Sequence, residues 1–194
     1  MKPALIDLTS ISFVIAFALV LSPLAQSTTL APLSLAQLTA SAAAVVHAEC
    51  TDNRAMWRDG EIWTVTSFRV LDNWKGNSPH EIQVWMIGGR AGPITSYVPG
   101  APRFRIGEEA VLFLEPAPSG SFGGALSITA WGEGTFRIRR DPRTDEMRVT
   151  QDTAITPDFD PSSHTFRETG IRNWPLAKLK ARVIAAESSQ RRMP

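Results

Sequence analysis

The sequence predicts a mainly β fold: a small antiparallel barrel of five to six strands, with a short N-terminal helix and a C-terminal helix. β-branched and aromatic residues dominate a long run from Ile62 that stops at Lys75-Gly76. Shorter apolar runs, bounded by Gly, Pro, Asn or Asp, stand on both sides of it as candidate neighbouring strands. Apolar residues at helical spacing occur near the C-terminus, and an alanine-rich segment precedes the first strand.

The first 27 residues are typical of an export signal. Lys2 gives a minimal positive start, Ile11 to Leu21 is an uncharged apolar core, and Ser27 ends a small-residue cleavage motif. This core is shorter than the roughly 20 residues that a membrane span needs. We therefore expect residues 1–27 to be removed, no membrane span to remain, and the product to be periplasmic or secreted.

Residues 28–150 are expected to form the barrel domain with its N-terminal helix. Ser34 and Gln37 fit a capping box at the start of a helix over residues 35–41. A first strand is predicted over residues 44–51. The turn-forming residues 52–54 should end it, and Asp59-Gly60 should form a tight reversal into the central strand.

The central strand carries apolar side chains on both faces. Because side chains alternate along a strand, Phe68 and Val70 share one face, and we assign them to the core. Trp63 and Leu71 point the other way, and we expect a helix or loop to cover them. In the next strand, residues 81–87, Ile82, Val84 and Met86 are expected to share a face.

The second half alternates loops with apolar runs. Residues 88–102 contain four Gly and three Pro and are predicted to be a long loop. Residues 110–114 should form a buried strand. Residues 126–140 should form another, with a bulge at 132–134, and residues 147–150 a short edge strand.

The last 44 residues divide into two parts. Residues 151–173 are polar and predicted to be an irregular surface segment. Residues 174–194 should form a helix and a short tail, with Pro175 in the first turn. Leu176, Leu179 and Val183 recur at helical spacing and should dock on the barrel.

Composition excludes some classes of partner and cross-link. The formal net charge is +1 and no basic stripe runs along the chain, so nucleic acid is not expected as a ligand. Cys50 is the only cysteine, so no intramolecular disulfide can form in an exported chain. We expect Cys50 to be a small buried residue on a strand.

These patterns resemble a group of uncharacterised exported bacterial proteins with an OB-like barrel, over roughly Ser34 to Arg140. The motifs are structural and imply no particular activity. They lie at Ala44–Val46, Thr64–Val70, Trp74–Gly76, Ile82–Val84, Gly88-Gly89, Pro99–Pro102 and Phe104–Leu114.

More distantly, the strand order and the passage from Phe68 to Gly76 resemble the netrin-like module of tissue inhibitors of metalloproteinases. That resemblance implies inhibition of a secreted zinc protease. Those inhibitors bind the protease zinc through a disulfide-tied N-terminal cysteine. Here the predicted mature N-terminus is a threonine-rich linker, and Cys50 stands alone within a strand.

No catalytic or metal site is predicted. His47, His80 and His164 are far apart and lack zinc-type spacing. Glu108 and Glu109 are adjacent, so on an extended chain they face opposite sides and cannot easily act as an acid–base pair. We expect neither a cofactor nor enzymatic activity. A small hydrolase, which would need Arg90, Glu108, Glu109 and His80 to converge, is a minor alternative.

The candidate binding residues come from the glycine-rich loop and from the surplus of aromatic side chains. Gly88, Gly89 and Arg90 could shape a binding loop, and exposed aromatic rings on such a barrel can stack on sugars. We predict a non-catalytic exported module that binds a macromolecule, with protein favoured over glycan. Its contacts would come from residues 88–102 and one barrel mouth, with weak candidates Gly88, Gly89, Arg90, Tyr97, Trp57 and Trp85.

Overall fold

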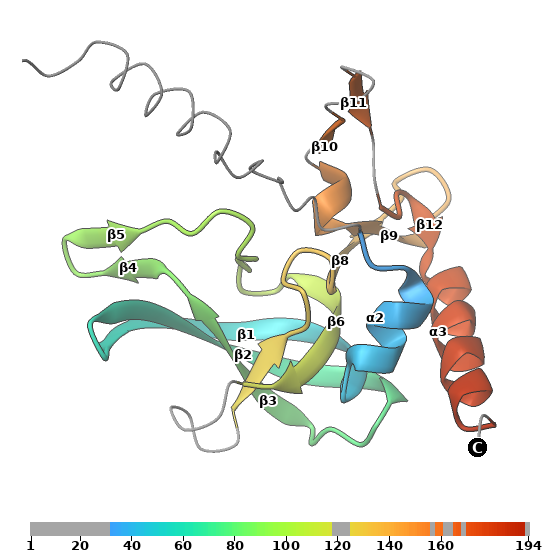
Figure 1. The fold of residues 1–194 in the computed structure, drawn as a ribbon, viewed down its shortest axis with the longest axis horizontal. Helices are drawn as coiled ribbons and strands as arrows, with labels where there is room; N and C mark the ends of the chain where they lie inside the picture. Colours follow the sequence, from blue (N-terminus) through green and yellow to red (C-terminus); the bar gives the residue numbers. More distant parts are fainter. Residues whose placement is uncertain (1–31, 118–124, 156–157, 161–164, 168–169, 193–194) are drawn as a thin grey trace, which may run out of the picture. The chain divides into compact units, whose positions relative to one another are not determined.

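The computed structural model describes residues 32–117, 125–155, 158–160, 165–167 and 170–192. The predicted export signal lies outside these residues. Strands predominate in the described part, together with helix α2 (Leu35–Ser41) and helix α3 (Leu176–Gln190) (Figure 1). The predicted mainly β fold with a helix near each end is confirmed.

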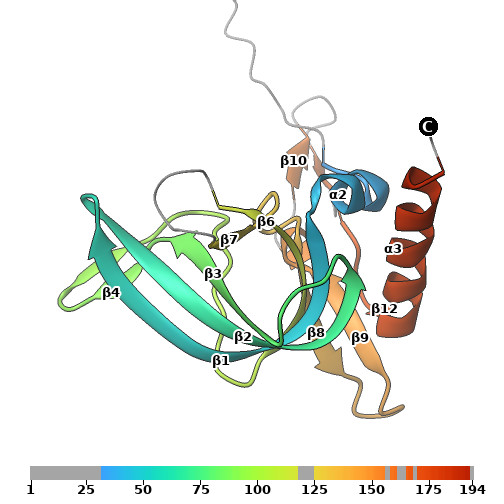
Figure 2. The same ribbon diagram turned by 90° about the horizontal axis from the view of Figure 1, so that it is seen from below.

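Five strands form a ring, which Figure 2 shows from its open end. The ring runs from β1 (Ala44–Arg58) to β2 (Glu61–Lys75), β3 (Glu81–Ile87), β7 (Leu126–Ile128) and β6 (Glu109–Pro116), which returns to β1. All pairings are antiparallel except that of β3 with β7. In the described residues, that parallel seam rests on the pair Val84 and Leu126. The OB-like barrel is thus present and partly closed.

The sheet continues beyond the ring on the far side of β6. β6 pairs with β8 (Thr135–Arg140), β8 with β9 (Met147–Gln151), and β9 with β12 (Trp174–Pro175). Because β12 covers its outer side, β9 is not the edge strand that the sequence suggested.

The break predicted within residues 126–140 is a full turn rather than a bulge. β7 and β8 pair with different stretches of β6, and residues 129–134 loop out between them. Ala130 and Trp131 have φ of 49° and 50°, which turns the chain sharply. A Cβ at Gly134 would lie 2.1 Å from the carbonyl oxygen of Thr129, so only glycine fits there.

β1 is longer than predicted, and the expected turn at residues 52–54 is wrong. A bulge between Cys50 and Asp52 shifts the pairing with β2 by one residue, and β1 then continues along β2 to Arg58. The side-chain amide oxygen of Asn53 accepts a hydrogen bond from the Thr66 hydroxyl at 2.8 Å, and this bond holds Asn53 in place. The predicted reversal at Asp59-Gly60 is present, with φ of 52° and 82°.

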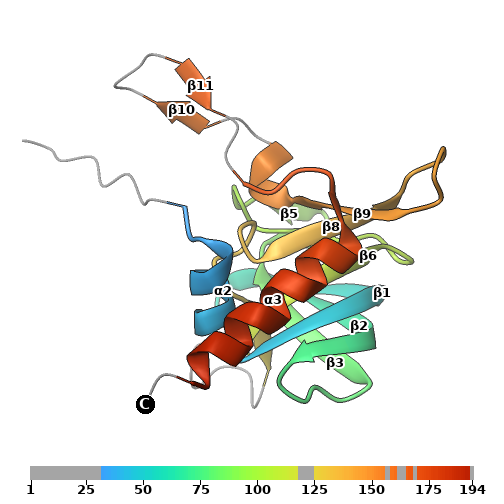
Figure 3. The same ribbon diagram turned by 90° about the vertical axis from the view of Figure 1, so that its right-hand side faces the viewer.

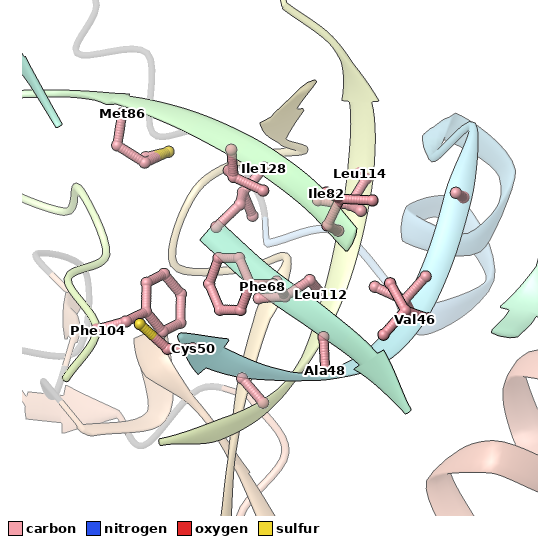
Figure 4. Packing of buried hydrophobic residues seen from close by; sticks show 14 residues of the cluster. Val46, Ala48, Cys50, Phe68, Ile82, Met86, Phe104, Leu112, Leu114 and Ile128 are labelled. Atoms are coloured by element: carbon pink, nitrogen blue, oxygen red, sulfur yellow. The ribbon is translucent and has the colours of Figure 1, made fainter. Parts of the chain in front are cut away.

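The barrel interior holds the side chains that alternation assigned to it. Phe68 and Val70 of β2 are buried, and so are Ile82, Val84 and Met86 of β3. Figure 4 shows Phe68 at the centre of this cluster, with Phe104 beside it. The two rings meet edge to face, with centroids 4.9 Å apart. Cys50 is fully buried in the same cluster, as predicted.

A second core lies outside the ring, beneath the two helices. Val45, Val111 and Phe113 point away from the interior and are fully buried. Leu179 and Val183 of α3 pack in this cluster, so the predicted docking face is confirmed. Figure 3 shows α2 and α3 side by side over this part of the sheet. Burial on both faces explains why β6 is apolar from Ala110 to Leu114.

Three predicted irregular or covered regions differ from the structure. Leu71 is 44% exposed, although Lys180 of α3 bonds the neighbouring Asp72, so the expected covering of Leu71 is wrong. The loop 88–102 contains a hairpin of β4 (Gly89–Ala91) and β5 (Ile94–Ser96). The segment 151–173 contains a 3-10 turn, η1 (Asp152–Ile155), and a hairpin of β10 (Asp158–Asp160) and β11 (Thr165–Arg167). In the β4–β5 hairpin, Gly92 and Pro93 form the turn between the two strands and therefore interrupt neither of them.

Candidate functional site

The β4–β5 hairpin lies across the distal part of the β1–β2 hairpin, as the first two views show (Figures 1 and 2). We call these two elements, residues 54–65 and 88–97, the hairpin arm. The strands of this part of β1 and β2 extend beyond the ring, because β6 pairs with β1 only as far as Glu49 in the described residues.

Gly88 and Gly89 make the crossing of the two hairpins sterically feasible. The Gly88 N–H donates to the Ile62 carbonyl at 2.7 Å, and the Gly88 carbonyl accepts from the Thr64 hydroxyl at 2.7 Å. A Cβ at Gly89, where φ is 134°, would lie 2.2 Å from the Thr64 hydroxyl oxygen. The two glycines therefore fix one hairpin on the other. Because the Gly88 N–H already donates to the Ile62 carbonyl, it is not available to bind an anion.

Exposed apolar side chains gather on the hairpin arm. Among the described residues, eight large hydrophobic side chains are exposed, and four of them belong to the arm. They are Met56 (38%), Trp57 (53%), Ile94 (50%) and Tyr97 (75%). Large exposed apolar groups concentrated on one element mark interaction surfaces more often than the same groups scattered singly.

The predicted aromatic residues do not form one face. Trp57 is opposite Ile62, and Trp85 of β3 is opposite Val65. Positions 62 and 65 differ in parity, so Trp57 and Trp85 lie on opposite faces of the sheet. Tyr97 and Arg90 are on the arm, with the guanidinium of Arg103 5.8 Å from the Tyr97 ring centroid. Trp57, Arg90 and Tyr97 thus belong to the arm, whereas Trp85 lies on β3, with the guanidinium of Arg58 of the arm 5.5 Å from its ring centroid.

A charged cluster closes one mouth of the barrel. Arg137 of β8 donates two hydrogen bonds to the Asp152 carboxylate, both at 2.8 Å, and one to Glu108 at 2.7 Å. Its guanidinium lies 4.4 Å from the ring centroid of Phe104, which packs on Phe68. Burial alone would lower the pKa of Arg137, but Asp152 and then Glu108 raise it above its ordinary value. The cluster is fully paired and holds the mouth together.

A second charged cluster lies on the outer face of β1, β2 and β6. His47 Nε2 and a Glu109 carboxylate oxygen are 2.7 Å apart. Asp72 accepts from Lys180 of α3 at 2.5 Å and from the indole N–H of Trp74 at 3.0 Å. Burial would raise the pKa of Asp72, but the bonds from Lys180 and Trp74 hold it below its ordinary value. This cluster ties helix α3 to the barrel.

The residues of the minor hydrolase alternative do not share one site. Glu108 contacts Arg137, whereas the neighbouring Glu109 contacts His47, so the predicted opposite orientation holds. Arg90 lies on β4 and His80 in the β2–β3 turn. Within the described part of the chain, no three His, Cys, Asp or Glu side chains are placed to hold a metal ion. His164 lies outside that part.

Cys50 is a packed residue with little thiolate character. It is fully buried, and the Asn53 amide donates to its sulfur at 3.4 Å. Burial raises the pKa of the Cys50 thiol.

Neither helix in the described residues is long and apolar enough to cross a membrane.

Sequence reasoning missed two parts of the arm and the Arg137 cluster. Ile94 follows Gly92-Pro93 directly and begins a β-favouring Ile-Thr-Ser run, which could have indicated the hairpin. Met56 was missed because the preceding turn-forming residues concealed the strand. No local signal links Arg137 to Glu108 or Asp152.

No family model matches the chain, and no curated protein matches it.

Proposed function

We propose that this protein is an exported, non-catalytic binding module that docks on another protein through its hairpin arm. The observation that carries the proposal is the exposure of Trp57, Ile94 and Tyr97 on two mutually braced hairpins; Met56, next to Trp57 in β1, faces the other side of the sheet. Tyr, Trp and Met are enriched in protein–protein interfaces, whereas isolated surface apolar residues are common and need no partner.

The geometry of the arm favours binding because its backbone is already ordered. Both hairpins are paired along their strands, and the contacts of Gly88 with Ile62 and Thr64 fix their crossing. A preorganised surface loses less conformational entropy on association than a mobile loop does. Trp57 and Tyr97 would then be the central anchors, and truncation of such an anchor typically costs about 2 kcal/mol or more of binding energy.

Inhibition of a zinc protease by an N-terminal cysteine, which the distant resemblance implies, is not supported. Cys50 is fully buried inside β1 and its sulfur contacts Asn53. The separate positions of Arg90, His80, Glu108 and Glu109 also support a non-catalytic role over a small hydrolase.

The proposal is tested by comparative affinity capture. The protein, produced from the full chain with a C-terminal tag, is incubated with the envelope and secreted fractions of the producing organism. The Trp57→Ala/Tyr97→Ala variant removes both anchors. Trp131→Ala is the matched control, because Trp131 is 40% exposed and lies outside the arm.

We expect one protein to be retained by the wild type and the control, and at least about tenfold less by the double variant, which corresponds to a loss of about 1.4 kcal/mol. A direct dissociation constant for the purified partner with each variant then measures the effect. Equal retention by the double variant, or loss by the Trp131 control alone, would contradict docking through the arm.

A further inference from the structure

The outward face of helix α3 is basic. Residues 176–192, which are α3 and the two residues after it, contain five Lys or Arg and one Glu, a local charge of +4. The formal charge of the whole chain is +1, so the remaining residues carry −3. Helix α2 packs beside α3 and contains no charged residue. The charge of this protein is therefore polarised toward α3.

Three of these five cations have no carboxylate partner. Two pair with the carboxylates of Asp72 and Glu187. The other three, Lys178, Arg182 and Arg192, are exposed and form no ion pair within the described residues. Arg182 and Arg192 follow Lys178 by four and fourteen residues, close to one and four helical turns, so the three side chains project from one side of α3. Their charges are available to a partner.

Short side chains fill the surface between these cations. Ala181, Ala185 and Ser189 are exposed on the same side of α3. The long cationic side chains extend beyond them, so all three charged groups can reach a planar surface together. Leu179 and Val183, on the opposite side of the helix, are buried in the second core. The apolar stripe of α3 is thus not free to insert into a bilayer, and contact through this face must be electrostatic.

The spacing and composition of this face favour an extended anionic surface over other anionic partners. The three cations span about 20 Å of helix, so a small anion could contact only one of them at a time. The aromatic side chain at the start of the helix, Trp174, has the Lys178 ammonium 4.2 Å from its ring centroid, so one face of the ring is not open to stack on a nucleic-acid base. The centre of the face consists of alanine and serine instead of the large anchors that dominate protein interfaces.

We infer that the outward face of α3 binds the surface of an anionic phospholipid bilayer. The lysine and arginine groups would pair with lipid phosphates, and no part of α3 would insert. The helix and the hairpin arm lie at opposite ends of the described domain (Figures 1 and 2). Membrane contact through α3 would therefore leave the arm on the side away from the bilayer, where a protein partner can reach it.

The test is cosedimentation of the purified protein, produced from the full chain, with lipid vesicles. The vesicles contain phosphatidylcholine alone, or phosphatidylcholine and phosphatidylglycerol in equal parts. Binding to the neutral vesicles measures any contribution of other segments, including residues 1–27. The α3 variant, Lys178→Gln/Arg182→Gln, removes two exposed cations. The matched control, Arg54→Gln/Arg90→Gln, removes the same charge from exposed positions of the hairpin arm. Immobilised duplex DNA and polyglutamate are the competing polyanions.

We expect the protein to bind anionic vesicles about a hundredfold more tightly than neutral ones, because each Lys or Arg near an anionic bilayer raises the affinity roughly fivefold. The α3 variant should lose at least about tenfold of this affinity and the matched control less than about twofold. Salt at about 0.5 M should abolish the binding, because it screens exposed charges.

The membrane face is also distinguishable from the protein-docking surface. The Trp57→Ala/Tyr97→Ala variant should bind anionic vesicles as the wild type does, whether or not the arm has a protein partner. Equal binding to both kinds of vesicle, equal losses in the α3 variant and the matched control, or tighter binding to DNA or polyglutamate than to anionic vesicles would overturn the inference.

Discussion

Replacing Arg137 with methionine should destabilise the barrel by about 3 kcal/mol. Among the described residues, Arg137 is the one cation that pairs with both Asp152 and Glu108 at the barrel mouth. Methionine retains most of the aliphatic stem and the packing on Phe104, so the substitution removes mainly charge and hydrogen bonds.

The magnitude follows from the burial of the groups left behind. The side chains of Arg137 and Asp152 are 14% and 15% exposed, and that of Glu108 is 28% exposed. Removing one partner of a fully buried ion pair costs about 3–5 kcal/mol, because the remaining charge is uncompensated. Glu108 can regain water more easily than Asp152, which places the expected cost near the lower end of that range.

Urea unfolding followed by tryptophan fluorescence measures this cost. With a slope of about 2 kcal/mol per molar urea, the midpoint should fall by roughly 1.5 M. Arg139→Met, an exposed neighbour on β8, should change the free energy of unfolding by less than about 0.5 kcal/mol. Asp152→Asn in the Arg137→Met background should recover part of the loss. A loss below about 1 kcal/mol, or one equal to that of Arg139→Met, would refute the reasoning.

Three further changes test other parts of the fold by the same unfolding assay. Gly89→Ala places a Cβ 2.2 Å from the Thr64 hydroxyl oxygen and should lower the free energy of unfolding by at least about 2 kcal/mol. The control Gly92→Ala has open space but φ of 63°, and should cost about 1 kcal/mol. Equal costs would refute the tight crossing. Leu179→Ala should cost about 2–5 kcal/mol and Arg182→Ala, at an exposed position of α3, almost nothing, and a small effect for Leu179 would show that α3 is not docked. The pKa of Asp72 is lowered in the folded state, so the contribution of its carboxylate to stability is present at neutral pH and is lost as the pH falls below about 4. The difference in free energy of unfolding between wild type and Asp72→Asn should therefore shrink from pH 7 to pH 3. A constant difference would contradict this.

The elements that the sequence predicted well are those with local physical signals. The capping box at Ser34 and Gln37 marks the start of α2, and both of its hydrogen bonds are present. Alternation placed Phe68 and Val70 in the barrel interior, and apolar spacing identified Leu179 as a docking residue of α3. Each of these signals depends on residues no more than a few positions apart.

The errors arose where tertiary pairing overrides local preference. Residues 52–54 favour a turn on their own, but β2 pairs with them in register and a bulge before them adjusts the strand. The glycines at 88 and 89 were interpreted as part of a long binding loop, yet they allow close contact with Thr64 and fix the β4–β5 hairpin. Glycine permits both outcomes, and the sequence does not distinguish them.

The candidate sites were only partly predictable. Trp57 and Tyr97 were identified as aromatic binding candidates, but their common location depends on the crossing of two hairpins. The parallel pairing of β3 with β7 joins strands that are separated in the chain by β4, β5 and β6. The Arg137 cluster joins residues that are 29 and 15 positions apart. Such long-range contacts follow from topology and leave no local pattern.

The most direct test of docking through the arm is site-specific photo-crosslinking in the producing organism. A photoreactive phenylalanine analogue replaces Tyr97, which is 75% exposed on the arm, or Ile184, which is 41% exposed on α3. The account predicts that irradiation yields one discrete crosslinked protein from position 97 and none from position 184. Absence of any product from position 97, or the same product from both positions, would contradict the assignment of the hairpin arm as the protein-binding surface.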